Sequence, residues 1–196
     1  IVGSALVLAS SALDRPAAKW ADKHQGGNWD SAGKATNYIP VALAATSTAL
    51  RFGAGGDVAA DTARASLLAA GWTLGLNTAT RFVVGRSRPD ENMGPDSFKG
   101  PSKNSISSSF PSNHMGLAFA TVTPYAQRFD APWLYLIAGA TAFGRIQQRQ
   151  HFVSDVVAGS LIGYGMGSLM LDRQRNDRDA KVSIGLNRSV NVSWQY

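Results

Sequence analysis

Five segments rich in small and apolar residues constrain the fold of this 196-residue chain more than any other feature. Each is long enough for a helix, and they cover residues 38–52, 57–82, 113–127, 131–143 and 152–172. Their length and periodicity favour helices over strands. A further helix is expected to run from the apolar opening of the chain through Pro16 to Trp20. We therefore expect an all-α bundle of about six helices.

The C-terminal residues change period. In residues 181–196, apolar and polar side chains alternate on both sides of Asn187–Ser189, which predicts a small β-hairpin with one apolar face. An isolated hairpin is marginally stable, so this face must pack on the bundle, a partner or a membrane. The length predicts a single domain, 1–196, with its catalytic motifs within residues 81–155.

His151 and Asp155 lie four residues apart at the start of an apolar run. A helix that begins here places both on one face. The carboxylate can then accept from one ring nitrogen, which fixes the tautomer and leaves the other nitrogen free to attack. Arg145 adds a planar cation suited to phosphate oxygens, and the helix N-terminus also favours an anion. The pair is interpreted as an oriented nucleophile.

Two other clusters supply groups that suit the same anion. Ser112 is a candidate N-cap, whose hydroxyl and following amides can face a phosphate. His114 then falls in the first turn of that helix, where a histidine can donate a proton to a leaving oxygen. Arg81 and Arg88 are seven residues apart, about two helical turns, so both could reach one anion.

In order and spacing, these clusters resemble the motifs of the type 2 phosphatidic acid phosphatase (PAP2) superfamily, which includes bacterial class A acid phosphatases and vanadium haloperoxidases. The superfamily pattern is Lys-x6-Arg-Pro, then Pro-Ser-Gly-His, then Ser-Arg-x5-His-x3-Asp. This chain has Arg81 in place of the lysine, Asn113 in place of the glycine and Gly144 in place of the serine. Asparagine tolerates positive φ better than other non-glycine residues, so its amide can still face phosphate. The resemblance covers roughly residues 65–172.

The resemblance implies a bundle of the PAP2/haloperoxidase type and a phosphatase that needs no metal ion or other cofactor. His151 would attack phosphorus and form a phosphohistidine, Asp155 would orient it, and His114 would protonate the leaving oxygen and then activate water. The phosphoryl oxygens would be bound by Arg81, Arg88, Ser112, Asn113 and Arg145. The substrate would be a phosphate monoester or a terminal pyrophosphate, on a small molecule or a lipid.

Two alternatives stay open. The same pocket would hold vanadate in a vanadium-dependent haloperoxidase, although the chain is short for one. The departures at Arg81, Asn113 and Gly144 also leave open a non-catalytic phosphate-binding or scaffold protein. A phosphatase should survive chelation and be inhibited by vanadate, whereas a haloperoxidase should gain halide oxidation with vanadate and a binding protein should show neither response.

The charge balance favours an anionic partner. The formal net charge is +6, yet no nucleic-acid-binding motif is present, so nucleic acid is not expected as a partner. The chain has no cysteine, which excludes disulfides and thiol chemistry and is compatible with an oxidising compartment. Composition and resemblance together point to a bacterial periplasm. Oligomeric state is not indicated.

Membrane association is expected to be peripheral at most. The longest mostly apolar segments without charged residues are 35–50 and 156–171, 16 residues each, whereas a spanning helix needs about 20. The mean hydropathy is −0.10. We expect a soluble or peripherally associated protein, with an integral membrane protein as the alternative. Gly159, Gly163 and Gly167 recur every four residues and predict close helix packing inside the bundle.

The segment 86–110, rich in Pro, Gly, Ser and Asn, is expected to be a long loop that acts as a lid or as a substrate-selecting wall. Its acidic residues are expected to be solvated. His24 is expected to be a solvated loop residue. Arg86 and Arg149 lie close to the motifs and are as consistent with a solvated position as with a contact to substrate.

Overall fold

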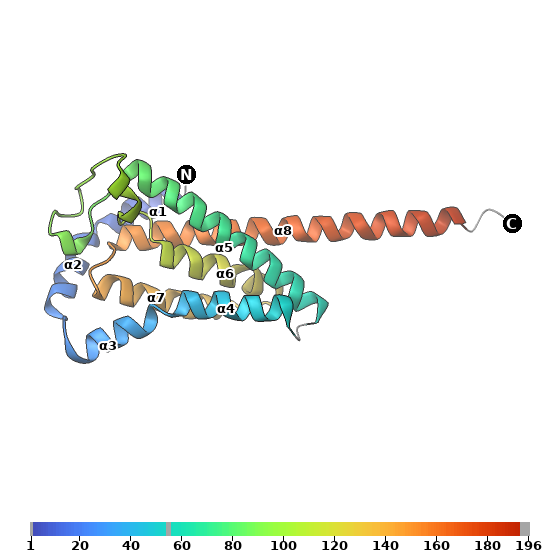
Figure 1. Ribbon diagram of the computed structural model, residues 1–196, viewed down its shortest axis with the longest axis horizontal. Coiled ribbons are helices and arrows are strands. Elements are labelled where there is room, and N and C mark those ends of the chain that lie inside the picture. Colours follow the sequence, from blue (N-terminus) through green and yellow to red (C-terminus); the bar gives the residue numbers. More distant parts are fainter. Residues whose placement is uncertain (1, 54–55, 193–196) are drawn as a thin grey trace.

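The computed structural model describes residues 2–53 and 56–192, which form an all-α structure (Figure 1). Its α-helices are α1 (Val2–Ser11), α2 (Asp14–Lys23), α3 (Gly27–Thr36), α4 (Ile39–Phe52), α5 (Asp57–Val84), α6 (Asn113–Arg128), α7 (Leu134–Gln147) and α8 (Val153–Val192). Two short 3-10 helices, η1 (Pro89–Glu91) and η2 (Lys103–Ser107), lie between α5 and α6. No strand occurs in the described residues, so the expected all-α architecture is confirmed.

The N-terminal region departs from the prediction. A single helix through Trp20 is wrong, because α1 ends at Ser11 and α2 begins at Asp14. Pro16 has no amide hydrogen, and inside a continuous helix its ring would clash with the carbonyl four residues earlier. It is accommodated in the first turn of a new helix instead. The helix α3 was not expected either, so the described residues hold more helices than the six or so predicted.

The helix α6 lies at the centre of the bundle and packs against α5, α7 and α8. Glycines on α8 allow the closest of these approaches. A Cβ at Gly159 would come within 3.0 Å of the carbonyl oxygen of Ser112, and one at Gly163 would come within 3.0 Å of the carbonyl oxygen of Gly116. The prediction that this glycine row serves helix packing is confirmed. Beyond the bundle, α8 continues as a single long helix (Figure 1).

This packing brings four helix ends together at one end of the bundle. There α5 and α7 end, while α6 and α8 begin. The amide of Ser112 donates to the carbonyl of Asp155 at 3.0 Å, which ties the start of α6 to the start of α8. Nε of Arg81, near the end of α5, donates to the carbonyl of Pro111 at 2.8 Å. Two positive helix N-termini thus face the place where the sequence motifs meet.

The segment 86–110 is tied to itself and to the bundle. It doubles back so that Arg86 and Phe98 form an isolated bridge. Glu91 pairs with Lys99 within the segment. Its acidic side chains are exposed, as expected. The segment is therefore an ordered surface layer over the ends of α5 and α6.

His24 and Arg149, for which a solvated position was considered, both belong to packed clusters. His24 is not a solvated loop residue, because its ring stacks on Trp20 with centroids 4.7 Å apart and meets Trp29 edge-on at 4.9 Å. Arg149 pairs with Asp22 at 2.7 Å and is mostly shielded from solvent. The His24 ring therefore packs between α2 and α3, and Arg149 ties α2 to the segment that leads into α8.

The predicted C-terminal hairpin is not tested. It spans residues 181–196 and runs into residues 193–196, which lie outside the part of the chain that the structure describes. Within the described ranges, no helix has both the length and the apolar character needed to cross a bilayer.

Candidate active site

His151 lies where the three motif clusters meet. Its Nδ1 is 2.7 Å from the carbonyl oxygen of Ser109 and 3.7 Å from Oδ2 of Asp155. Because a carbonyl only accepts, Nδ1 carries the ring hydrogen and Nε2 holds the lone pair. Nε2 is buried and has no hydrogen-bond partner in the part of the chain that the structure describes. The ring thus presents a free, oriented nitrogen, as a nucleophile requires. The closer orienting group, Ser109, was not indicated by the sequence.

The protonation of His151 suits that role. Burial lowers its pKa to about 4, although the neighbouring carboxylate of Asp155 acts in the opposite direction. The nearby cations Arg145 and Arg81 lower the pKa further. Above about pH 4 the imidazole is therefore neutral, and its lone pair is available.

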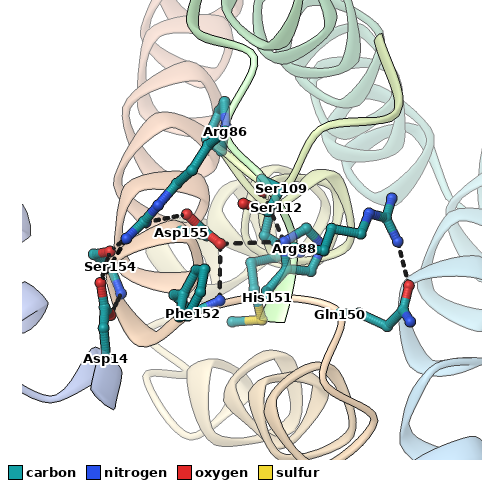
Figure 2. Close-up of polar contacts among 12 residues, drawn as sticks. Asp14, Arg86, Arg88, Ser109, Ser112, Gln150, His151, Phe152, Ser154 and Asp155 are labelled. Carbon is teal, nitrogen blue, oxygen red and sulfur yellow. Dashed lines mark hydrogen bonds and ion pairs between the residues drawn. The ribbon is translucent and has the colours of Figure 1, made fainter. Parts of the chain in front are cut away.

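Asp155 is held on both oxygens (Figure 2). Oδ2 accepts from the backbone amide of Phe152 at 2.8 Å, and Oδ1 accepts from Nη1 of Arg86 at 2.5 Å. Burial would raise the pKa of Asp155, but the neighbouring His151 ring, the charge of Arg86 and the Phe152 amide lower it overall. The carboxylate therefore stays ionised beside the imidazole.

Arg86 links Asp155 to a second buried carboxylate, Asp14 on α2. Its Nη2 donates to Oδ2 of Asp14 at 2.8 Å. Asp14 also accepts from the amide and the hydroxyl of Ser154 at 2.9 and 2.7 Å. The guanidinium lies over the ring of Phe152, 4.5 Å from its centroid. These contacts clamp α2 to the start of α8 (Figure 2).

Sequence reasoning missed the function of this network. Arg86 is not solvated, because it is 5 % exposed and bound by two carboxylates. Asp14 was not singled out. An acidic residue just before Pro16 signals a helix start, but no pattern pairs it with an arginine 72 residues away.

Three arginines surround the nucleophile. Arg81 and Arg145 are buried, and burial is the main reason that their pKa values fall to about 10, so both are charged at neutral pH. Nε of Arg145 has no hydrogen-bond partner among the described residues. Arg88 donates to Gln150, and its charge contributes to the lowered pKa values of Arg81 and Arg145. This concentration of positive charge favours the binding of an anion.

The start of α6 matches the second motif. Ser112 is the N-cap, as predicted, and its Oγ accepts a long hydrogen bond of 3.5 Å from the amide of Met115. Asn113 is the first residue of the helix, and its Oδ1 is buried without a partner. Asn113 is not among the non-glycine residues with positive φ. The tolerance of asparagine for positive φ is therefore not used at this position, and the prediction that the Asn113 amide faces phosphate stays a prediction.

His114 lies in the first turn of α6, as predicted. Burial lowers its pKa to about 4, and the charges of Arg145, His151, Arg81 and Arg88 lower it further, in that order. A neighbouring cation disfavours the protonated ring, whereas a bound phosphate favours it. His114 thus becomes a better proton donor once an anion occupies the site.

Gly144, the departure in the third motif, has a packing reason. A Cβ at this position would come within 3.0 Å of the carbonyl oxygen of Gly33 and of the hydroxyl of Thr36. Glycine lets α7 approach α3 closely, so the serine of the superfamily pattern would not fit here without movement. The chain therefore lacks the serine hydroxyl of the superfamily pattern at this position, and the glycine allows α3 to pack against α7 instead.

An open cavity of about 510 Å³ leads to the site. It is lined by Gln25, Asp30, Lys34, Asn37, Tyr38, Val41, His114, Arg145 and Gln148. Its wall comes from α3, from the start of α4 and from the residue after α7. The segment 86–110, expected as a substrate-selecting wall, does not line this cavity. Among the described residues, no cluster of three or more histidine and acidic side chains could hold a metal ion.

Comparison with known proteins agrees with the motifs. A family model described as the PAP2 superfamily matches residues 62–179. Lipid A 1-phosphatase from Porphyromonas gingivalis is 30% identical over 101 residues, which make up 48% of this chain and 20% of that protein. The chain thus spans about a fifth of the length of this relative. No solved structure matches the chain. Because the family model covers more than half of the chain and includes all three motifs, the chain belongs to the PAP2 superfamily.

Proposed function

We propose that this protein is a metal-independent phosphatase that passes the phosphoryl group of a monoester or terminal pyrophosphate to His151 and then to water. The observation that carries the proposal is the buried Nε2 of His151, which has no partner among the described residues and lies near the charges of Arg145 and Arg81. Such a nitrogen is costly to leave unpaired in the core unless a ligand uses it.

In the first step, the substrate phosphate lies against Arg81, Arg88 and Arg145, with the amides at the start of α6 as further donors. The lone pair of His151 Nε2 attacks phosphorus while the bond to the leaving oxygen breaks. His114 gives its proton to that oxygen, so the leaving group departs as a neutral alcohol or as phosphate. The arginines stabilise the charge on the phosphoryl oxygens in the transition state.

In the second step, water attacks the phosphohistidine. His114, now neutral, takes a proton from the water, and the bond between phosphorus and Nε2 breaks. Inorganic phosphate is released, and both histidines return to their starting states. Asp155 stays ionised throughout and stabilises the positive charge that the His151 ring acquires when it is phosphorylated.

A lipid phosphate is included among the candidate substrates. The Porphyromonas gingivalis relative is named for its action on lipid A. Aromatic and aliphatic side chains are also exposed on the helix surfaces, among them Trp72 and Trp133 at 63 and 58 %. These observations support a location next to a membrane, and the absence of cysteine supports the bacterial periplasm.

The test is release of inorganic phosphate from an aryl phosphate and from a lipid phosphate in detergent, with a chelator present. His151→Ala should abolish turnover, and wild type should form an acid-labile phosphoryl adduct during turnover that this variant lacks. His24→Gln is the matched control, because His24 lies outside the site and should retain activity. Turnover that persists in His151→Ala would refute the proposal. A folded wild-type protein that oxidises halide in the presence of vanadate but releases no phosphate would support the haloperoxidase hypothesis instead.

A further inference from the structure

The open cavity beside His114 bears on the chemistry of the leaving group. Nε2 of His151 attacks phosphorus from one side, and in-line displacement sends the leaving oxygen to the opposite side. His114, the proposed donor to that oxygen, lines the cavity together with Arg145. His151 does not line it. The group attached to the scissile phosphate therefore extends into this cavity.

Most residues of the cavity wall carry hydrogen-bonding groups of both kinds. Nε2 of Gln25 donates to the carbonyls of Ala21 and Gln147, which leaves its carboxamide oxygen as an acceptor, and Oε1 of Gln148 accepts from Asn37, which leaves its carboxamide nitrogen as a donor. Asp30 contributes a carboxylate, and Lys34 contributes an exposed ammonium group. The cavity volume of about 510 Å³ lies within the range of about 300–1,000 Å³ typical of small-molecule sites.

The polar wall is held in place. Oδ1 of Asp30 accepts from the amide of Gly26 and from Nε2 of Gln147, both at 3.0 Å. Those two hydrogen bonds, in that order, lower the pKa of Asp30, so it is ionised at neutral pH. Nδ2 of Asn37 donates to Oε1 of Gln148 at 2.5 Å. The side chains thus present a fixed array rather than a mobile surface.

An alkyl chain at this place would cover Asp30 and Lys34 without offering them partners, and a diacylglycerol would offer ester oxygens to Lys34 but no donor to Asp30, which is unfavourable. Hydroxyl groups donate to the carboxylate and accept from the ammonium group and the carboxamides. The ring of Tyr38, 72 % exposed, gives an aromatic surface for the C–H face of a sugar ring. We propose that this cavity binds a glycosyl leaving group, so that the preferred substrate is a sugar phosphate, free or as the headgroup of a lipid.

This proposal rests on the proposed phosphatase activity and assigns its specificity to α3 and α4. These helices lie outside residues 62–179, the part matched by the family model. The specificity would then come from a region of the chain that the shared motifs do not include.

The experiment compares kcat/KM for phenyl phosphate and for glucosamine 1-phosphate in wild type, Lys34→Ala and Tyr38→Ala. Both side chains are exposed, so neither substitution is expected to disturb folding. We expect wild type to prefer the sugar phosphate at least tenfold. Lys34→Ala should lose about tenfold on the sugar phosphate through KM and stay within about twofold on phenyl phosphate, which has no hydroxyl groups for the ammonium. Tyr38→Ala should weaken binding of both substrates, because its ring can stack on a phenyl group as well as on a sugar. Val58→Ala, exposed on α5 outside the cavity, is the control.

The outcomes separate the two proposals. No turnover of either substrate would count against the phosphatase, and with it against this inference. His151-dependent turnover of phenyl phosphate at least as efficient as that of the sugar phosphate would leave the phosphatase standing and overturn the glycosyl cavity. Equal losses on both substrates in Lys34→Ala would overturn it too. A lipid-anchored glucosamine phosphate in detergent, assayed beside the soluble one, shows which source of the headgroup is preferred.

Discussion

At the scale of single residues, Arg86 has the largest structural effect outside the groups that would touch phosphate. It holds Asp155, which faces His151, and Asp14, which fixes the start of α8. Buried charges of this kind depend on one another, because removal of one partner leaves another uncompensated in a region that excludes water. The orientation of the nucleophile therefore depends on α2 as well as on its own helix.

We predict that Asp14→Ala lowers the free energy of unfolding by about 3–5 kcal/mol, because it leaves Arg86 with one carboxylate and the Ser154 amide without its acceptor. Asp96→Ala is the control, since the ion pair of Asp96 with Arg15 is 2.8 Å long but exposed. Its loss should cost less than about 1 kcal/mol. Urea denaturation at pH 7.5 measures both values. Similar losses in the two variants would show that the buried network adds no special stability.

A second prediction concerns the proton on His114. The charge of Arg145 is the largest of the neighbouring charges that lower the pKa of His114 to about 4. Arg145→Gln removes that cation, so the protonated ring becomes less unfavourable and the pKa should rise by about one unit. NMR titration of the ring signals of the three histidines measures this, with His24 as the internal control. Inorganic phosphate bound to wild type should shift the His114 signal in the same direction. No upward shift in either case would argue against the proposed acid.

At the scale of elements, the helices that the sequence predicts are those with a continuous apolar face. The helix α3 escapes prediction because its residues, from Gly27 onward, are mostly polar and include a second glycine, Gly33. Intrinsic propensity does not favour a helix there. It forms because Gly33 and Gly144 let α3 and α7 approach until their backbones nearly touch. A tertiary contact of this kind overrides local preference, and no local pattern reveals it.

The glycine row on α8 gives a test of packing with a control on the same helix. A Cβ at Gly163 would come within 3.0 Å of the Gly116 carbonyl oxygen, whereas one at Gly165 would have no atom within 4 Å. We predict that Gly163→Ala destabilises the protein by about 1–3 kcal/mol, because α6 and α8 must move apart. Gly165→Ala should stabilise it by about 0.5–1 kcal/mol, because alanine loses less backbone entropy in a helix. Thermal unfolding of both variants should show shifts of opposite sign, and shifts of the same sign would contradict the packing role.

At the scale of the whole molecule, the candidate site is assembled from helix ends that are distant in sequence. The spacing of the motifs was enough to predict that Arg81, Ser112, His114, Arg145 and His151 share one site, and the structure brings them together. It did not predict Asp14 or the wall of the open cavity. Asp14 comes from α2, and most of the wall comes from α3 and the start of α4, and the positions of these helices depend on docking against α7 and other helices of the bundle. The motif spacing predicts the residues that would touch phosphate. The residues that hold them in place, and those of the cavity wall, depend on tertiary contacts that have no sequence signature.

The assembly of this site should make the fold sensitive to acid. The pKa of His151 is about 4 in the folded protein and about 6.5 in an unfolded chain. Between these values the unfolded chain binds a proton that the folded protein does not, so stability falls as the pH is lowered from about 6.5 toward 4. The loss from this residue is at most about 3–4 kcal/mol, since one pKa unit corresponds to about 1.4 kcal/mol and the two values differ by about 2.5 units. Below that range, protonation of Asp155, whose pKa is also lowered, destabilises the protein further.

Urea unfolding of wild type and His151→Asn at pH 7.5, 6.0 and 5.0 measures this linkage. Asparagine can still donate to the Ser109 carbonyl but does not titrate, so the variant should lose less stability than wild type between pH 7.5 and 5.0. The remaining loss in the variant should come from His114, whose pKa is lowered in the same direction. Parallel losses in the two proteins would mean that His151 is protonated in the folded state at pH 5, and it could not then act as a neutral nucleophile there. A smaller loss in the variant would tie the acid sensitivity of the fold to the same neutral imidazole that the proposed attack on phosphorus requires.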